Sequence, residues 1–180
     1  MIIMAGIMTI GRVIKIIIFV ALSSLFSTSC AGKEIMNQDS LWNTIKALKS
    51  VWGKQAEDVS QLLNQPIVRV LPTADDRFTS APFTLLDGTR LSGLDIRLWG
   101  NGDRSVSLVS LNVDTPCITL EQVREHFTDV KLSQVPRGHA TGQLVSYKTV
   151  MDNRGLAWAF GFSAQEPRCL KRITMTNYAR

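Results

Sequence analysis

Two histidines and two pairs of adjacent carboxylates are the side chains best suited to acid–base chemistry. His126 is expected on a helix and His139 in a loop, and neither lies in a nucleophile or metal-ligand pattern. Glu57–Asp58 suits the first turn of a helix, where carboxylates interact favourably with the helix dipole. Asp75–Asp76 is predicted to lie in a solvated loop. The residues therefore favour a protein that is not an enzyme and uses no cofactor. A small cell-wall hydrolase stays open, because two carboxylates facing across a cleft would suffice.

Thiol chemistry is the other option, and it rests on Cys30, Cys117 and Cys169. No Cys-x-x-Cys occurs, and both histidines are far from Cys117 and Cys169 in sequence. This spacing argues against a zinc site. Lipidation and disulfide formation remain as the reactions that these cysteines could undergo.

The residues before Cys30 have the order of a bacterial export signal. Arg12 and Lys15 form a short basic segment, residues 16–26 are apolar, and small residues follow at 27–31. The apolar run is shorter than the roughly 20 residues that a membrane-spanning helix needs. We therefore predict an export signal over residues 1–29, with an uncleaved N-terminal anchor as the alternative.

Cys30 sits where bacterial lipoproteins carry the cysteine that becomes lipid-modified, and the segment resembles a lipoprotein signal. Thr28 and Ser29 match that pattern, whereas Ser27 stands where leucine is usual, so ordinary cleavage stays open. Ala31 after the cysteine implies the outer membrane rather than the inner one. The expectation is a periplasmic protein anchored to the outer membrane, with residues 30–39 as a tether.

An exported chain with an odd number of cysteines requires an explanation. Lipidation of Cys30 would leave Cys117 and Cys169, which can pair in the oxidising periplasm. We predict a Cys117–Cys169 disulfide; two separate buried thiols are the alternative.

The charge of the chain limits the class of partner. Twenty Lys and Arg against 15 Asp and Glu give a net charge of +5, and the basic residues form no run and do not alternate with aromatic residues. This distribution argues against nucleic-acid binding. A mild positive excess is compatible with an acidic partner or an anionic membrane surface.

Helical and strand periodicities alternate along the chain. Asp39 or Ser40 can cap a helix that carries apolar residues at Leu41, Ile45 and Leu48, and a second helix is expected to end before Pro66. Strands are predicted around the turn signals Asp87-Gly88 and Asn101-Gly102. The inward-facing strand residues are expected to be Leu94, Ile96, Leu98, Trp158, Phe160 and Phe162.

The same hydrophobic order recurs at an offset of 64 residues. Gln55–Leu63 aligns with Thr119–Phe127, and Leu94, Ile96 and Leu98 align with Trp158, Phe160 and Phe162. We therefore predict an α+β fold made of two tandem repeats of a helix packed on an antiparallel sheet. The first repeat spans residues 40–116 and the second 117–180, packed as one compact unit.

Both helix segments carry a recurring family pattern. Residues 56–66 and 119–127 resemble the helix of SmpA/BamE-like envelope lipoproteins and of the tandem-repeat β-lactamase inhibitor proteins, with Val59 and Val123 at the shared apolar position. The resemblance implies a protein-binding module in the periplasm, most simply an inhibitor or immunity protein against a toxin or hydrolase. A scaffold for envelope assembly is the alternative.

An antiparallel sheet covered by helices on one face leaves the other face open. Asp95, Arg97 and Trp99 should lie on that face, and together with Arg172 they are the predicted partner-binding residues. Trp99 could instead cover the Asn101-Gly102 hairpin. Ala157, Ala159 and Gly161 should leave a shallow groove beside Trp99, and the other three tryptophans are expected in the core: Trp42, Trp52 and Trp158.

Overall fold

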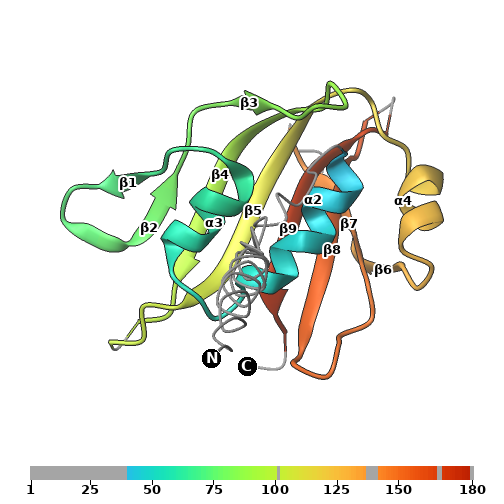
Figure 1. The fold of residues 1–180 in the computed structure, drawn as a ribbon. Coiled ribbons are helices and arrows are strands. Elements are labelled where there is room, and N and C mark those ends of the chain that lie inside the picture. The colour runs from blue at the N-terminus through green and yellow to red at the C-terminus, as the bar shows by residue number, and fades with distance from the viewer. Residues whose placement is uncertain (1–39, 101, 137–141, 166–167, 179–180) are drawn as a thin grey trace, which may run out of the picture. The chain divides into compact units, whose positions relative to one another are not determined.

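The computed structural model describes residues 40–100, 102–136, 142–165 and 168–178. Every described residue lies in one compact unit, within residues 37–180 (Figure 1). The predicted export signal over 1–29, Cys30, the tether over 30–39 and His139 all lie outside the described residues. The predictions made for them stay predictions.

Helix α2 (Leu41–Leu48) is held at its first turn by two acceptors. Ser40 Oγ accepts a hydrogen bond from the Asn43 N–H at 3.3 Å, which confirms Ser40 as the cap. Asp87, 46 residues further along, accepts the Leu41 N–H at 2.7 Å through Oδ2. Its other carboxylate oxygen accepts the Thr89 N–H at 2.9 Å, so one side chain joins the helix start to the turn after β3.

Replacing Asp87 by alanine is expected to lower the free energy of unfolding by about 1–2 kcal/mol, because two partly buried N–H groups lose their acceptor. Thermal unfolding followed by circular dichroism measures the loss. Asp87→Asn is the intermediate variant: it keeps one oxygen acceptor and replaces the other by an NH2 donor, so it should retain only one of the two hydrogen bonds. Equal melting temperatures for Asp87→Ala and the unmodified protein would contradict the proposed tie.

Two further short α-helices follow the same local rules. Helix α3 (Ala56–Leu63) begins with the Asp58 carboxylate accepting the Gln55 N–H at 2.9 Å, and it ends at Asn64 in the left-handed conformation. A one-turn 3-10 helix, η1 (Lys49–Val51), joins α2 to this segment. Helix α4 (Leu120–His126) starts with a reciprocal capping box between Thr119 and Gln122. None of the described helices has the length and apolar character needed to cross a bilayer.

Nine strands form one antiparallel sheet in the order β1-β2-β4-β5-β9-β8-β7-β6, and β3 pairs with β4 outside this path. Their bounds are β1 Val68–Leu71, β2 Ala74–Thr79, β3 Phe83–Thr84, β4 Arg90–Leu98, β5 Val106–Thr115, β6 Lys131–Gln134, β7 Leu144–Lys148, β8 Leu156–Ser163 and β9 Leu170–Asn177. Asp75–Asp76 lies within β2, so its prediction as a loop is wrong.

The predicted fold class, two tandem repeats of a helix packed on a sheet, is wrong. The described chain is dominated by a single continuous nine-stranded antiparallel sheet that carries only three short α-helices. Strands β5 and β9 pair directly, with Ser110 opposite Thr174, so the boundary drawn at residue 116 does not separate two sheets. The alternation of apolar and polar residues along a strand indicates which face of the sheet each residue occupies, but it carries no information about which strands pair.

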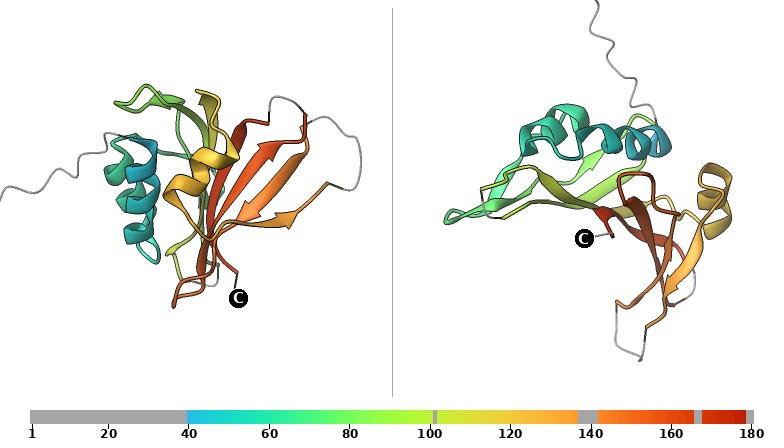
Figure 2. Two further views of the ribbon diagram at one scale, coloured as in Figure 1. Left: turned by 90° about the vertical axis from the view of Figure 1, so that its right-hand side faces the viewer. Right: turned by 90° about the horizontal axis from the view of Figure 1, so that it is seen from below.

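The predicted inward-facing strand residues are nevertheless buried. Leu94, Ile96, Trp158 and Phe160 are each at most 1% exposed, and they pack under the helices in one continuous core. Figure 2 shows the sheet bending so that α2, α3 and α4 lie on its convex side. We call the opposite, concave side the open face, because no described helix packs on it.

Candidate protein-binding face

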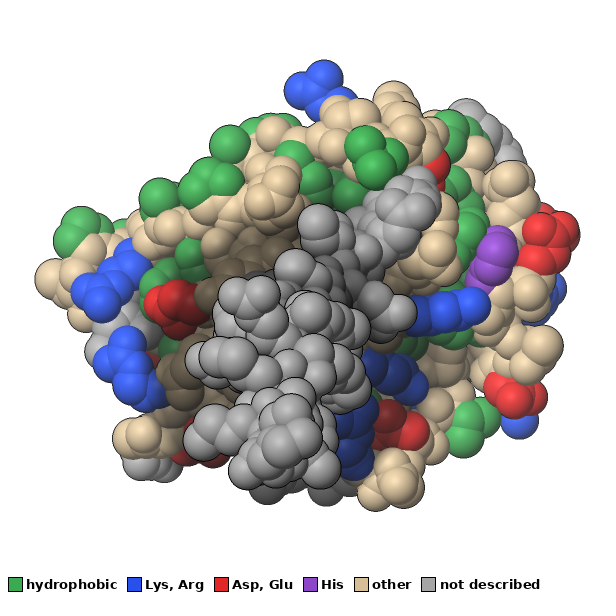
Figure 3. All heavy atoms as spheres, in the orientation of Figure 1, with side chains coloured by type: hydrophobic (Ala, Val, Ile, Leu, Met, Phe, Trp, Pro, Cys, Tyr) green, Lys and Arg blue, Asp and Glu red, His purple; other side chains and the backbone are tan. Residues whose placement is uncertain are grey.

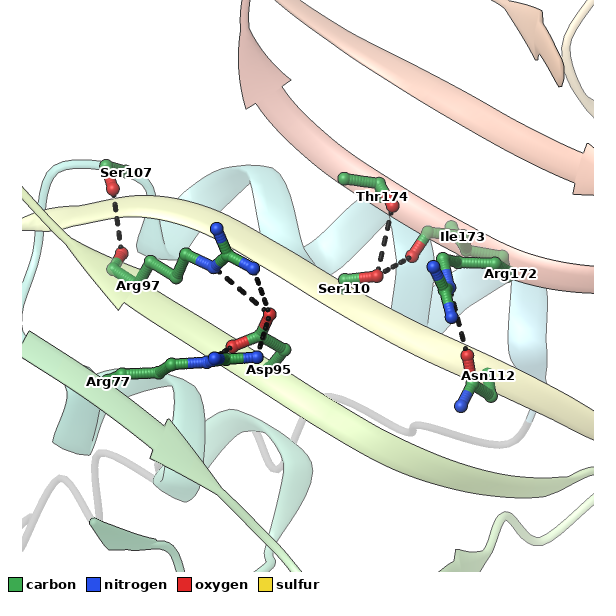
Figure 4. A network of polar contacts seen from close by, with 9 residues as sticks. All are labelled: Arg77, Asp95, Arg97, Ser107, Ser110, Asn112, Arg172, Ile173 and Thr174. Carbon is green, nitrogen blue, oxygen red and sulfur yellow. Dashed lines mark hydrogen bonds and ion pairs between the residues drawn. The ribbon is translucent and has the colours of Figure 1, made fainter. Parts of the chain in front are cut away.

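Alternation along each strand assigns the side chains of the open face. On β4, Asp95 and Arg97 alternate with buried Leu94, Ile96 and Leu98. The same pattern places a polar row across four neighbouring strands, and Figure 4 shows its residues. This row consists of Arg77 on β2, Asp95 and Arg97 on β4, Ser110 and Asn112 on β5, and Arg172 and Thr174 on β9.

Asp95 holds two arginines at one end of this row. Arg77 donates to it through Nε at 2.7 Å and Nη2 at 3.2 Å, and Arg97 donates through Nε at 3.1 Å and Nη2 at 3.0 Å. The carboxylate side chain is 18% exposed, whereas the two arginine side chains are about half exposed, at 47% and 51%. The guanidinium groups are thus fixed in orientation and still accessible to a partner.

The electrostatics of this cluster keep Asp95 ionised. Partial burial alone would raise its pKa, but the hydrogen bonds and charges of Arg77 and Arg97 outweigh that effect, so the pKa of Asp95 lies below its ordinary value. The hydrogen bond to Asp95 likewise raises the pKa of Arg77. Two positive charges therefore surround one permanent negative charge near neutral pH.

Because its folded-state pKa is lowered, Asp95 stabilises the fold fully above its unfolded pKa of about 4, and this contribution disappears as pH falls through the folded value. We expect Asp95→Asn to be less stable than the unmodified protein at pH 7, by about 1 kcal/mol or less for so accessible a cluster. The two stabilities should converge on acidification towards pH 2. Urea unfolding at a series of pH values measures the difference, and a difference independent of pH would contradict the assignment.

A second polar cluster lies further along the sheet. Ser110 Oγ and Thr174 Oγ1 are 3.0 Å apart, and Arg172 donates through Nε to the Asn112 side-chain oxygen at 3.2 Å. Gly93, in a bulge of β4, has φ +55, and a Cβ there would run into the side chain of Asn112. Glycine at this position therefore leaves room for the amide that orients Arg172.

The structure places the four predicted partner-binding residues unequally. Asp95, Arg97 and Arg172 lie on the open face, but in two separate clusters. Trp99 lies just beyond β4, partly buried and packed edge-to-face against Trp52, with ring centroids 6.5 Å apart. It lines a hollow of about 430 Å³ beside the β1–β2 hairpin, together with Val70, Leu71, Asp76, Arg77, Arg97, Leu98 and Ser107.

The predicted groove of small residues beside Trp99 is wrong. Strands β5 and β9 lie between β4 and β8, so Trp99 does not adjoin the small residues of β8. Ala157 is fully buried, and a Cβ on Gly161 would lie only 2.8 Å from Leu144 Cδ1, so that side chain already occupies the space.

Sequence reasoning missed Arg77 and Asn112, the side chains that complete the two clusters. Asn112 alternates with buried Leu111 and Val113, and that alternation was a usable signal. Arg77 precedes Phe78, which is 7% exposed, but the preceding Asp75–Asp76 pair suggested a loop. Its pairing with Arg97 depends on strand register, which the sequence does not specify.

Among the described candidate catalytic residues, Asp76 lines the hollow beside Trp99, whereas His126 and Asp58 belong to helices. His126, on α4, stacks on Trp42 with ring centroids 4.3 Å apart, and Asp58 serves the first turn of α3. Trp42 and Trp52 are half-buried at the edge of the core, whereas Trp158 is 1% exposed, so only Trp158 fully meets the core prediction. The described residues contain no group of three or more His, Cys, Asp or Glu placed to hold a metal.

Cys117 and Cys169 are joined as a disulfide, with their Cα atoms 4.9 Å apart. Cys117 lies between β5 and α4, and Cys169 immediately precedes β9. Next to the bridge, the Leu170 N–H donates to the Ile118 carbonyl at 2.8 Å. The bridge therefore links the segment that precedes α4 to the start of the strand that carries Arg172.

The chain matches no family model, no curated protein and no solved structure. The resemblance to envelope lipoproteins and inhibitor proteins therefore rests on the two helix segments of the sequence. A function for this chain has to be argued from the chemistry of the open face.

Proposed function

We propose that this protein is a binding module that holds another protein on the open face of its sheet. The observation that carries the proposal is the pair of arginines positioned by Asp95, each about half exposed, on a face that no described helix packs against. Arginine is enriched among the residues that dominate binding energy at protein interfaces. Its side chain is also costly to immobilise, and prior fixing by a carboxylate reduces that cost.

The proposal extends to the setting of the protein. Export is supported by the order of residues 8–31, and lipidation at Cys30 and anchoring to the outer membrane are supported by the resemblance of this segment to a lipoprotein signal. In that setting an inhibitor or immunity protein against a toxin or hydrolase is the role we favour, because a concave face suits a convex partner. The proposal assigns no catalytic role to any residue and needs no cofactor.

Affinity capture tests the proposed function. The full-length protein with a C-terminal tag is expressed from its own signal, extracted from the envelope with mild detergent and used to capture envelope proteins. We expect a partner whose recovery is stoichiometric and is unaffected by Lys46→Glu. Lys46 is an exposed residue of α2 on the convex side, where Figure 3 shows charged side chains of both signs.

The outcomes separate the candidate roles. Recovery of a toxin or hydrolase whose activity falls on binding supports the inhibitor, and recovery of barrel-assembly components supports the scaffold instead. Failure to recover any partner under several salt and detergent conditions would count against binding altogether. Hydrolysis of cell-wall material by the purified protein, abolished by Asp76→Ala, would favour the enzyme.

A further inference from the structure

The charges of the open face point to the chemistry of its partner. Apart from the Arg90–Asp114 pair, which is 3.8 Å apart, the described charged side chains of this face are five basic and one acidic, a net charge of 5 − 1 = +4. They are Arg77, Arg97, Lys131, Lys148 and Arg172 against Asp95. Asp76 lines the hollow at the edge, and exposed Lys171, next to Arg172, offsets it.

The arginines of the open face form two groups, which we call stations. Arg77 and Arg97 form the first around Asp95, and Arg172, oriented by Asn112, forms the second. Arg97 lies opposite Leu108 on β5, and Arg172 lies opposite Asn112 on the same strand. Four residues of strand separate those positions, which is roughly 14 Å, and two strand spacings of about 5 Å separate the arginines across the sheet.

Uncharged side chains lie on the open face between the two stations. Leu108, Ser110 and Thr174 lie there, and the two hydroxyl groups are hydrogen-bonded to each other. Each arginine retains donors that its present partner does not use, because Nε and Nη2 of Arg97 bind Asp95 while Nη1 does not. Guanidinium groups with remaining donors in a fixed orientation match the planar carboxylate of Asp or Glu.

We propose that the open face receives an acidic protein surface, with carboxylates from the partner on Arg97 and Arg172 and an uncharged segment over Ser110 and Thr174. This inference rests on the proposed function and adds the class of partner. A flat anionic membrane would meet the rims of a concave face rather than its floor. Nucleic acid is disfavoured because the basic residues of the chain form no run and do not alternate with aromatic residues.

Charge reversal tests each station against a control on the other side of the sheet. Arg97→Glu and Arg172→Glu are each expected to weaken capture of the envelope partner about tenfold or more, and the loss should shrink at high salt. Lys46→Glu makes the same charge change on the convex side and should leave capture unchanged. Because a glutamate beside Asp95 could disturb folding, melting temperatures are compared first, and Arg172→Glu provides an independent variant.

A carbodiimide reaction then identifies the groups in contact. Carbodiimide couples a lysine amine to a carboxylate without a spacer, whereas a guanidinium does not react. Arg97→Lys and Arg172→Lys place an amine at each station, and we expect cross-links from these positions to Asp or Glu of the captured partner. Lys46 on the convex side should form none.

Each result decides a different question. Capture that withstands both charge reversals, or cross-links that join the partner only to convex-side lysines, would overturn the acidic-surface inference while leaving the proposed binding function intact. Binding of the unmodified protein to vesicles of anionic lipid, lost in both charge-reversed variants without any protein partner, would overturn it in favour of a membrane. Capture of nothing would overturn both proposals.

Discussion

Removing the disulfide by the double change Cys117→Ala/Cys169→Ala is expected to lower the free energy of unfolding by about 4 kcal/mol, because the bridge closes a loop between residues 52 positions apart. Most of this effect arises in the unfolded chain, which gains conformational freedom once the loop is open. For a unit of this size the melting temperature should fall by roughly 8–16 °C. Urea unfolding and calorimetry of the unmodified and double-variant proteins measure both quantities.

The control for this experiment isolates the bridge from the third cysteine. All proteins carry Cys30→Ser, so that Cys117 and Cys169 are the only cysteines of the bridged protein. Thiol labelling of that protein without reduction should find neither of them free. Alanine rather than serine is used at position 169, because this residue is only 6% exposed and a hydroxyl there would add a cost of its own. A loss below about 1 kcal/mol would contradict a stabilising bridge.

The disulfide also affects the stability of the open face. It fastens Cys169 immediately before β9, and Arg172 follows three residues later on that strand. We expect the reduced protein to retain its partner at low temperature, since Asn112 still orients Arg172, and to lose it at temperatures where β9 detaches. In a reducing compartment the binding surface would therefore be lost at a lower temperature.

Local features of this chain could be predicted because they depend on neighbouring residues alone. Ser40 caps α2 through its own side chain, and Asn64 ends α3 in the left-handed conformation before Pro66. The inward positions on β4 and β8 also followed from alternation, with Ile96 and Phe160 both fully buried. Each of these depends on a period or a cap within a few residues.

The pairing of distant strands could not be predicted in the same way. The β5–β9 contact joins residues 60 to 68 positions apart, and nothing in either strand distinguishes a sheet that ends at β5 from one that continues into β9. The Arg77–Asp95 ion pair depends on the register of β2 against β4, and the Arg172–Asn112 contact depends on that of β5 against β9. Asp95, Arg97 and Arg172 could therefore be predicted as site residues from the sequence, but the partners that orient them could not.

The second large effect is expected in the core beneath α4. Phe160 is fully buried on β8, and its ring lies 5.1 Å from that of Phe127, the residue that ends α4. Phe160→Ala should lower the free energy of unfolding by about 3–5 kcal/mol, because the ring's transfer energy is lost and a cavity is left. Chemical denaturation measures the loss. Leu132→Ala on β6 is the matched control, since Leu132 is 57% exposed and should change stability by less than about 0.5 kcal/mol.

This substitution tests the binding face from the opposite side of the sheet. In the register of β8 against β9, Phe160 pairs with Ile173 and Gly161 pairs with Arg172, so a buried Phe160 requires an outward Arg172. A slip of one residue would turn Phe160 to the open face and Ala159 and Gly161 to the core. A loss of only a few tenths of a kcal/mol for Phe160→Ala would therefore indicate the slipped register. It would also place the Phe160 ring on the surface on which the acidic partner is expected to bind, beside Arg172, whose outward direction is set by the pairing of β9 with β5.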